Sequence, residues 1–228
     1  MSATWPRAVI FDLDGTLVDS LPDLANALGQ LFREEGLEPL PVAALKPMVG
    51  RGLGFLVERA FASVAAPLPS EALDRCRAHY LQTPVGQTVL YPGMRAVLER
   101  LKQEGCQLAV CTNKPADLAR AILDEMALTP FFAMILGGDS LAERKPHPGP
   151  LLHILDTFAL TPDQAVMVGD SPPDAEAAQA AGLRCVLCRY GYSTVPVETL
   201  GADAIIDQAE ELLLWLSQVG SGLATVRG

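Results

Sequence analysis

The chain has 228 residues, half of them hydrophobic, and a formal net charge of −10. This length suffices for one large domain, or for one domain that carries an inserted unit. The acidic charge argues against nucleic acid or an anionic membrane as the main partner, and no apolar segment has the length of a membrane span.

The cysteines and the first residues predict a cytoplasmic protein. Five cysteines, an odd number, are scattered along the chain and are typical of reduced thiols. The start, MSATWPRAVIF, lacks the basic patch, apolar stretch and cleavage site of a signal peptide. Cys185 and Cys188 form a CxxC, which we interpret as part of an apolar strand because no second CxxC or histidine cluster follows.

The first predicted element is a short strand over residues 7–12, RAVIFD, which ends at an aspartate. No strand pattern follows until about Thr83. Instead, residues recur at helical spacing in three stretches, 21–32, 55–60 and 72–80. We therefore predict a helical subdomain at 19–84, inserted into a core that is formed by 1–18 and 85–228.

The rest of the chain alternates between helical stripes and short apolar runs. The helical stripes cover 94–101, 118–126 and 151–158, and the strand-like runs cover 107–113, 132–138, 165–170, 184–189 and 202–207. Nearly continuous apolar character is typical of strands that are covered on both faces. The alternation predicts an α/β fold with an open parallel sheet. Residues 217–228 are predicted to form a loose tail.

Polar residues follow several of these strands, at the edge where parallel sheets bind ligands. A set of acids, hydroxyl and amide groups and one lysine should therefore converge from distant parts of the chain. They are Asp12, Asp14, Thr112, Asn113, Asp170, Ser171 and Asp174 at strand ends, and Lys145 in the loop after the third strand.

This set predicts phosphoryl transfer. Asp12 would be the nucleophile, because an ionised carboxylate can form an aspartyl-phosphate. Asp14 would protonate the leaving oxygen and then activate water. Oxygen ligands from Asp12, Asp170 and the Asp14 backbone carbonyl suit Mg²⁺.

The remaining residues would act on the phosphoryl oxygens. Lys145 adds positive charge there, and Thr112 and Asn113 add hydrogen bonds. Gly15 lets the backbone approach the phosphate. Each residue alone also has an ordinary explanation, such as an Asp-Gly turn, but together those explanations would leave several acids at one sheet edge without a counter-charge.

Four motifs occur in the order DLDGT, CTNK, KPHP and GDSPPD, with the helical insertion after the first. In these motifs the chain resembles the haloacid dehalogenase (HAD) superfamily, from Arg7 to about Ile206. The resemblance implies a three-layered Rossmann-like core with an inserted α-helical cap. It also implies the following roles: Asp12 as nucleophile, Asp14 as acid and base, Thr112 and Lys145 as phosphoryl ligands, Asp170 on Mg²⁺, Gly15 and Thr16 at the substrate, and Ser171 and Asp174 in support.

Within the superfamily, the stretches MVGRGLGFLVERAF, KPHPGPLL and GDSPPDAEAAQAAG are most similar to phosphoglycolate phosphatases. This similarity implies Mg²⁺-dependent hydrolysis of a small phosphorylated metabolite, 2-phosphoglycolate, by a monomer or homodimer. One departure is Pro172-Pro173, where relatives usually carry other residues. Two prolines suit the first turn of the Ala-rich helix that follows, and the departure concerns the substrate more than the chemistry.

Other functions of related chemistry are alternatives. Phosphatases of sugar phosphates, nucleotides or pyrophosphate would share the core motifs. A phosphomutase carries a different last motif, without the second acid found here at Asp174. A phospho-aspartate signalling module lacks a cap, and a dehalogenase would not need an acid at Asp14.

The cap should select the substrate, because the core motifs contact only the phosphate. Arg51 lies between Gly50 and Gly52 and could bind a substrate carboxylate, with Lys46 as a weaker candidate. A solvated arginine beside flexible glycines would explain the same pattern.

Overall fold

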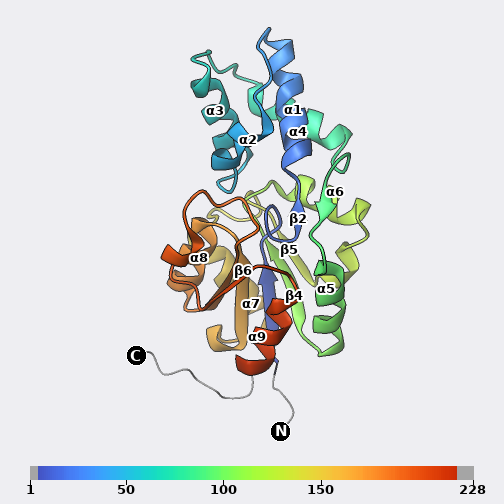
Figure 1. The fold of residues 1–228 in the computed structure, drawn as a ribbon, viewed down its shortest axis with the longest axis vertical. Helices are drawn as coiled ribbons and strands as arrows, with labels where there is room; N and C mark the ends of the chain where they lie inside the picture. The colour runs from blue at the N-terminus through green and yellow to red at the C-terminus, as the bar shows by residue number, and fades with distance from the viewer. Residues whose placement is uncertain (1–4, 220–228) are drawn as a thin grey trace.

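A computed structural model describes residues 5–219 and has the predicted α/β architecture (Figure 1). Six parallel strands form one sheet in the order β5-β4-β1-β6-β7-β8. They are β1 (Ala8–Phe11), β4 (Gln107–Cys111), β5 (Met134–Leu136), β6 (Ala165–Gly169), β7 (Arg184–Cys188) and β8 (Ala204–Ile206). Each of the six predicted runs contains one of these strands, which confirms the fold class.

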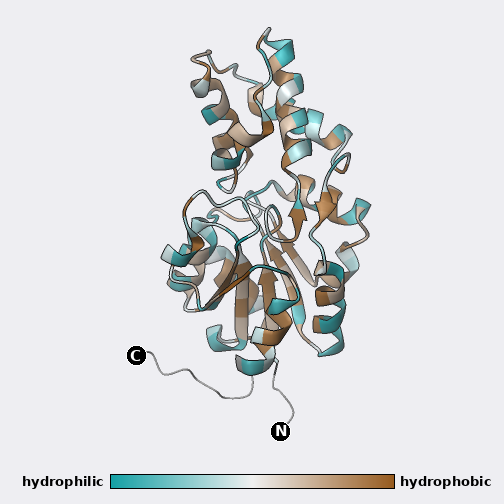
Figure 2. Ribbon diagram, in the orientation of Figure 1, coloured by the Kyte–Doolittle hydropathy of each residue, from teal (hydrophilic) through white to brown (hydrophobic). Residues whose placement is uncertain are grey.

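Helices cover both faces of the sheet and make three layers. Because side chains alternate along a strand, Val9 and Phe11 join one core while Ala8 and Ile10 join the other. The strands are accordingly mostly hydrophobic, although β4 and β7 begin with the exposed Gln107 and Arg184, whereas the outer helices carry many hydrophilic positions (Figure 2). The first core includes α5 (Met94–Gln103), α6 (Ala116–Glu125) and α9 (Glu211–Val219), and the second includes α7 (Gly149–Phe158) and α8 (Pro172–Ala181).

Four further helices stand beyond the carboxyl ends of the strands, at the top of Figure 1. Helix α4 packs against both α1 and α3, and the Phe32 and Phe61 rings meet edge to face at 4.9 Å. This group contains the predicted cap, whose boundaries at 19 and 84 stay a prediction. Its helices are α1 (Leu21–Glu34), α2 (Val42–Leu45), α3 (Leu53–Ser63) and α4 (Ala72–Gln82).

A two-stranded antiparallel ribbon joins the helical group to the sheet. Strand β2 (Val18–Asp19) pairs with β3 (Val89–Leu90), so the chain enters and leaves the helical group side by side. The apolar pattern does not predict this ribbon, because two residues are too few to show a period.

The predicted turn chemistry after β6 is confirmed, since α8 begins at Pro172 and has proline in its first turn. The predicted tail is partly wrong, because α9 extends to Val219; its remainder, 220–228, lies outside the described residues. Among the described residues, no helix is both long and apolar enough to cross a membrane. Short 3-10 turns occur at Lys46–Met48, Thr129–Phe131, Pro162–Gln164 and Val197–Thr199.

Candidate active site

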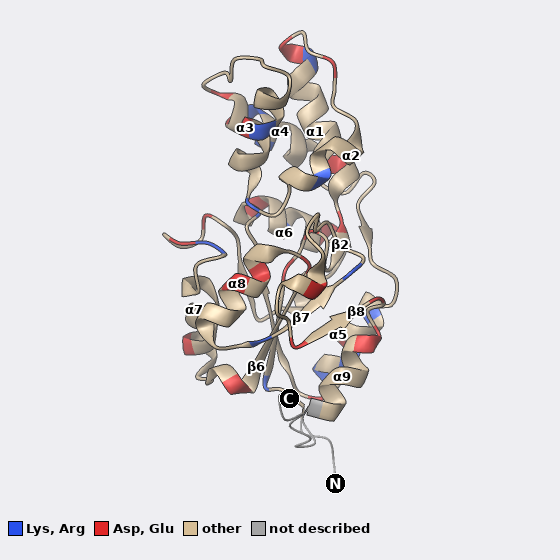
Figure 3. Cartoon of the chain, turned by 60° about the vertical axis from the view of Figure 1, so that its left-hand side comes forward, with Lys and Arg blue, Asp and Glu red and all other residues tan. Residues whose placement is uncertain are grey.

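Two aspartates follow adjacent strands at the centre of the sheet. Asp12 comes directly after β1, and its backbone N–H donates to Val168 O of β6 at 2.9 Å. Asp170 comes directly after β6, so the parallel pairing of β1 and β6 places both acids at one edge. Figure 3 shows acidic residues in the band between the sheet and the helices above it, as well as on the outer helices.

A buried lysine links the first acid to the last motif. Lys145 Nζ lies 3.1 Å from Asp12 Oδ1 and 2.6 Å from Asp174 Oδ1. Burial by itself lowers the pKa of Lys145, but the two carboxylates outweigh it and hold the pKa above its ordinary value. Lys145 is therefore a fixed positive charge next to Asp12.

Asp174 organises the loop between β6 and α8. Its Oδ2 accepts hydrogen bonds from the Ser171 hydroxyl at 2.7 Å and from the backbone N–H groups of Ser171 and Asp170 at 3.1 and 3.2 Å. Both Asp174 oxygens are therefore engaged, one by Lys145 and one by this loop. We assign Asp174 to the support of Lys145 and Asp170, as the sequence predicts for it and for Ser171.

The three acids of this site carry more negative charge than the one ammonium bonded among them compensates. Ligand atoms of Asp12, Asp170 and Asp174 lie within 4.8 Å of one another, with Lys145 as the ammonium bonded among them. Burial raises the pKa of Asp12 to about 6, although Lys145 opposes this. Burial, and then Asp174 and Asp12, raise the pKa of Asp170 well above its ordinary value. Such a site of hard oxygen atoms fits a divalent cation such as Mg²⁺.

The turn after Asp14 lies against Asp170. Gly15 has a φ of +83°, and a Cβ there would lie 2.4 Å from Asp170 Oδ2. Only glycine satisfies both the backbone angle and the close approach. The Thr16 hydroxyl lies at a long hydrogen-bond distance of 3.5 Å from Asp170 Oδ1, and Tyr192 N–H donates to Asp170 Oδ2 at 2.6 Å.

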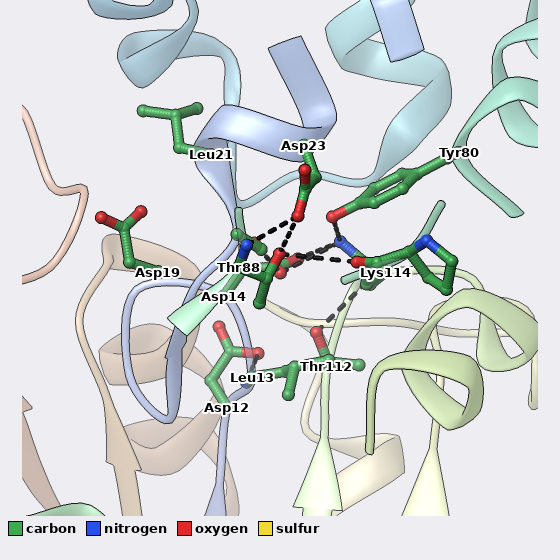
Figure 4. Close-up of polar contacts among 12 residues, drawn as sticks. Asp12, Leu13, Asp14, Asp19, Leu21, Asp23, Tyr80, Thr88, Thr112 and Lys114 are labelled. Atoms are coloured by element: carbon green, nitrogen blue, oxygen red, sulfur yellow. Dashed lines mark hydrogen bonds and ion pairs between the residues drawn. The ribbon is translucent and has the colours of Figure 1, made fainter. Parts of the chain in front are cut away.

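Asp14 has partners different from those of Asp12. Lys114 Nζ lies 3.0 and 3.1 Å from its two carboxylate oxygens, and the Ser20 hydroxyl donates to Oδ1 (Figure 4). Lys114 also donates to the Tyr80 hydroxyl of α4 at 2.9 Å. Neither Lys114 nor Tyr80 is among the residues that the sequence predicts for the site. The CTNK motif contains Lys114, but nothing in its spacing indicates that the side chain turns toward Asp14.

Thr112 and Asn113 follow β4, as predicted, and are buried. The Thr112 hydroxyl accepts the Lys114 backbone N–H at 3.3 Å. Asn113 Nδ2 donates to the carbonyl of Gly50 in the helical group at 2.9 Å and to that of Lys145 at 2.8 Å. Asn113 thus connects the loop that carries Arg51 to the core, and its predicted contact with the phosphoryl group stays a prediction.

Two adjoining hollows contain the predicted substrate residues, and Asp14 and Gly50 line both of them. An inner cavity of about 30 Å³ is lined by Asp12, Asp14 and Thr112 from the core and by residues of α1, α3 and α4. The exposed Arg51 instead lines an outer hollow of about 180 Å³, together with Lys46 and Asp170. Its guanidinium lies 5.5 Å from the centre of the Phe55 ring.

Comparison with known sequences agrees with the resemblance that the four motifs indicate. The family model described as haloacid dehalogenase-like hydrolase matches residues 9–188. A phosphoglycolate phosphatase of Rhodospirillum rubrum is 48% identical over 219 residues, which are 92% of this chain and 91% of that protein. One of Pseudomonas putida is 39% identical over 227 residues, or 96% of this chain and 83% of that protein.

Solved structures resemble the whole fold. A crystal structure of a predicted phosphoglycolate phosphatase from Haemophilus somnus has a TM-score of 0.87 and 33% identity, and covers 94% of this chain and 99% of its own. CbbY from Rhodobacter sphaeroides, in complex with phosphate, has a TM-score of 0.79 and 27% identity, and covers 91% of this chain and 96% of its own.

Proposed function

Because the chain belongs to the haloacid dehalogenase-like hydrolases, we propose that it hydrolyses 2-phosphoglycolate to glycolate and phosphate, with Mg²⁺ and through an aspartyl-phosphate. At the coarser level it is a phosphatase, a phosphoric monoester hydrolase. The observation that carries the proposal is the contact of Lys145 with both Asp12 and Asp174, beside Asp170 at the strand ends.

Asp12 is the proposed nucleophile. Its Oδ1 accepts the Leu13 N–H at 2.7 Å and contacts Lys145, so we assign the attack on phosphorus to Oδ2. The P–O bond to the leaving alcohol breaks as the Oδ2–P bond forms. Water then attacks the same phosphorus and releases phosphate and the free Asp12 carboxylate.

Asp14 is the proposed general acid and base. It lines the same cavity as Asp12, and residues of the helical group line the other side of that cavity. In the first step its proton passes to the leaving oxygen, and in the second it takes a proton from the attacking water. Ser20 and Lys114 hold the carboxylate in place.

Mg²⁺ is the proposed cofactor, held by the carboxylates of Asp12 and Asp170 and by the Asp14 carbonyl. When bound, it supplies positive charge for the phosphate and for the acids around it. The excess negative charge of the buried acids and the absence of His and Cys from this group of described residues support this choice over Zn²⁺.

The remaining groups of the core are assigned to the phosphoryl oxygens. Lys145 supplies charge and the Thr112 hydroxyl a hydrogen bond, the turn at Gly15 lets the backbone approach the phosphate, and contacts of Thr16 and Asn113 with the substrate stay predictions. This assignment agrees with the burial of both side chains after β4 and with the close approach of Gly15 to Asp170.

The substrate assignment is supported by the named relatives. The inner cavity of about 30 Å³ holds only one or two water molecules, so glycolate enters it only if the helical group moves away from the core. Phosphatases of sugar phosphates or nucleotides remain the alternative, since the outer hollow beside Arg51 is larger.

The experiment is a phosphatase screen over small phosphomonoesters that include 2-phosphoglycolate, sugar phosphates, nucleotides and pyrophosphate, with and without Mg²⁺. The highest kcat/KM is expected for 2-phosphoglycolate with Mg²⁺ present. A clear preference for another class would replace the substrate and leave the phosphatase assignment intact.

A further inference from the structure

Lys114 is a second buried cation, and the proposed mechanism uses it only to hold Asp14 in place. It is 6% exposed, its Nζ contacts Asp14 and the Tyr80 hydroxyl, and it lies 4.3 Å from the centre of the Tyr80 ring. A buried ammonium is costly unless it is paired, and Lys145 already supplies the charge next to Asp12. The pairing of Lys114 with Asp14 offsets this cost, and its place in the inner cavity indicates a second role.

The lining of the inner cavity indicates what this second role is. Of the described residues that line it, Lys114 alone carries a positive charge, while α1 and α3 contribute leucines from the helical side. Tyr80 brings a hydroxyl from the same side. An anionic group that enters this space therefore meets Lys114 and the Tyr80 hydroxyl beside the leucines of α1 and α3. The core side of the cavity is lined by Asp12, Asp14, Thr112 and Asn113.

We propose that Lys114 and Tyr80 together bind the carboxylate of the leaving alcohol and so select 2-phosphoglycolate, an inference that rests on the proposed function. The carboxylate of this substrate is one methylene away from the oxygen that Asp14 protonates. Since Lys114 Nζ lies within 3.1 Å of both Asp14 oxygens, a group so close to the leaving oxygen is within its reach.

The contacts of Lys114 allow one of them to pass from Asp14 to the substrate carboxylate. Lys114 uses two contacts on the single carboxylate of Asp14 and a third on Tyr80. Transfer of one Asp14 contact to the substrate keeps an ion pair on each side of the ammonium. Because Lys114 follows β4 and Tyr80 belongs to α4, the binding site is complete only when the helical group lies against the core.

Arg51 is less suitably placed for the same group. It is exposed, contacts the Phe55 ring and lines the outer hollow rather than the inner cavity. A solvated guanidinium discriminates an anion weakly, whereas a buried ammonium discriminates it strongly.

The test compares two substrates of similar length, 2-phosphoglycolate and 2-hydroxyethyl phosphate, in which a hydroxymethyl group replaces the carboxylate. The ratio of their kcat/KM values measures recognition of the carboxylate and cancels effects on the shared phosphoryl chemistry. Lys114→Met should lower this ratio about thirtyfold or more, mainly through KM for 2-phosphoglycolate, and Tyr80→Phe should lower it severalfold. Lys102→Met, an equal loss of charge at an exposed site on α5, should leave the ratio unchanged.

The outcomes separate the two proposals. If the unmodified protein does not prefer 2-phosphoglycolate, the proposed substrate is wrong. If it does, but Lys114→Met and Tyr80→Phe keep the ratio while Arg51→Ala abolishes it, the carboxylate binds at Arg51 and this inference is overturned. Should Lys114→Met fail to fold, Tyr80→Phe decides alone, because it retains the buried ring and removes only the hydroxyl.

Discussion

The carboxylate of Asp23 in α1 accepts hydrogen bonds from both the backbone N–H and the hydroxyl of Thr88, each at 2.7 Å (Figure 4). It also accepts the N–H groups of Gly86 and Gln87, each at 2.9 Å. One buried side chain at the start of the helical group thus fixes the segment by which the chain returns to the sheet.

Asp23→Ala should therefore lower the free energy of unfolding by about 2–4 kcal/mol, because it leaves several buried N–H groups without an acceptor. Denaturation by urea measures the loss. Asp74→Ala, at an exposed position of α4, is the matched control and should change stability by less than about 0.5 kcal/mol. Equal effects of the two changes would contradict the role of Asp23.

Asp12→Asn should reduce kcat by well over a hundredfold, since an amide cannot attack phosphorus as a carboxylate does. Circular dichroism should remain that of the folded protein, because asparagine has nearly the same size. Near-normal turnover in this variant would refute the covalent mechanism.

Removal of Mg²⁺ with EDTA should abolish activity, and added Mg²⁺ should restore it. A second measurement does not depend on activity: saturating Mg²⁺ should raise the Tm of the unmodified protein, by an amount equivalent to about 2.7 kcal/mol at a hundred times Kd. Asp170→Asn should lose most of this increase. An unaltered Mg²⁺ effect in the variant would exclude Asp170 as a ligand.

The pKa of Asp12 predicts how the metal-free protein responds to pH. Burial raises this pKa from 3.8 to about 6, so the folded state holds a proton that the unfolded state has already released. The resulting stability is present below about pH 4 and is lost as pH rises through 6, by at most roughly 3 kcal/mol.

The measurement is Tm in EDTA from pH 4 to 7 for the unmodified protein and for Asp12→Asn, which does not titrate at this position. The unmodified protein should lose stability relative to the variant over this range. A constant difference would show that Asp12 titrates at an ordinary pKa when folded, and a change in the opposite direction would show that its pKa is lowered.

The sequence predicts those parts of the fold that depend on extended patterns. Runs such as AVIF and AVMVG are long enough to identify β1 and β6, and the acids after them follow from where parallel strands end. Strands β2 and β3 have two residues each and were missed. Their pairing depends on contacts between segments about seventy residues apart.

The candidate site also has parts that the sequence predicts and a part that it does not. Asp12, Asp170 and Lys145 were predicted to converge, and the structure brings them together with Asp174. The contact between Lys114 and Tyr80 was not predicted, because it depends on how α4 lies against the loop after β4. No spacing within one motif contains that information.

The central place of β1 also affects how the chain folds as it is made. Ala8 lies beside Gln107 on one side and Ala165 on the other, so β1 leaves the ribosome long before either neighbour exists. The helices between residues 21 and 82 pack against one another and depend on nearer segments. During most of translation, the four apolar residues of β1 therefore lack their sheet partners. A chain that stalls before residue 165 leaves one edge of β1 open to pairing with other nascent chains.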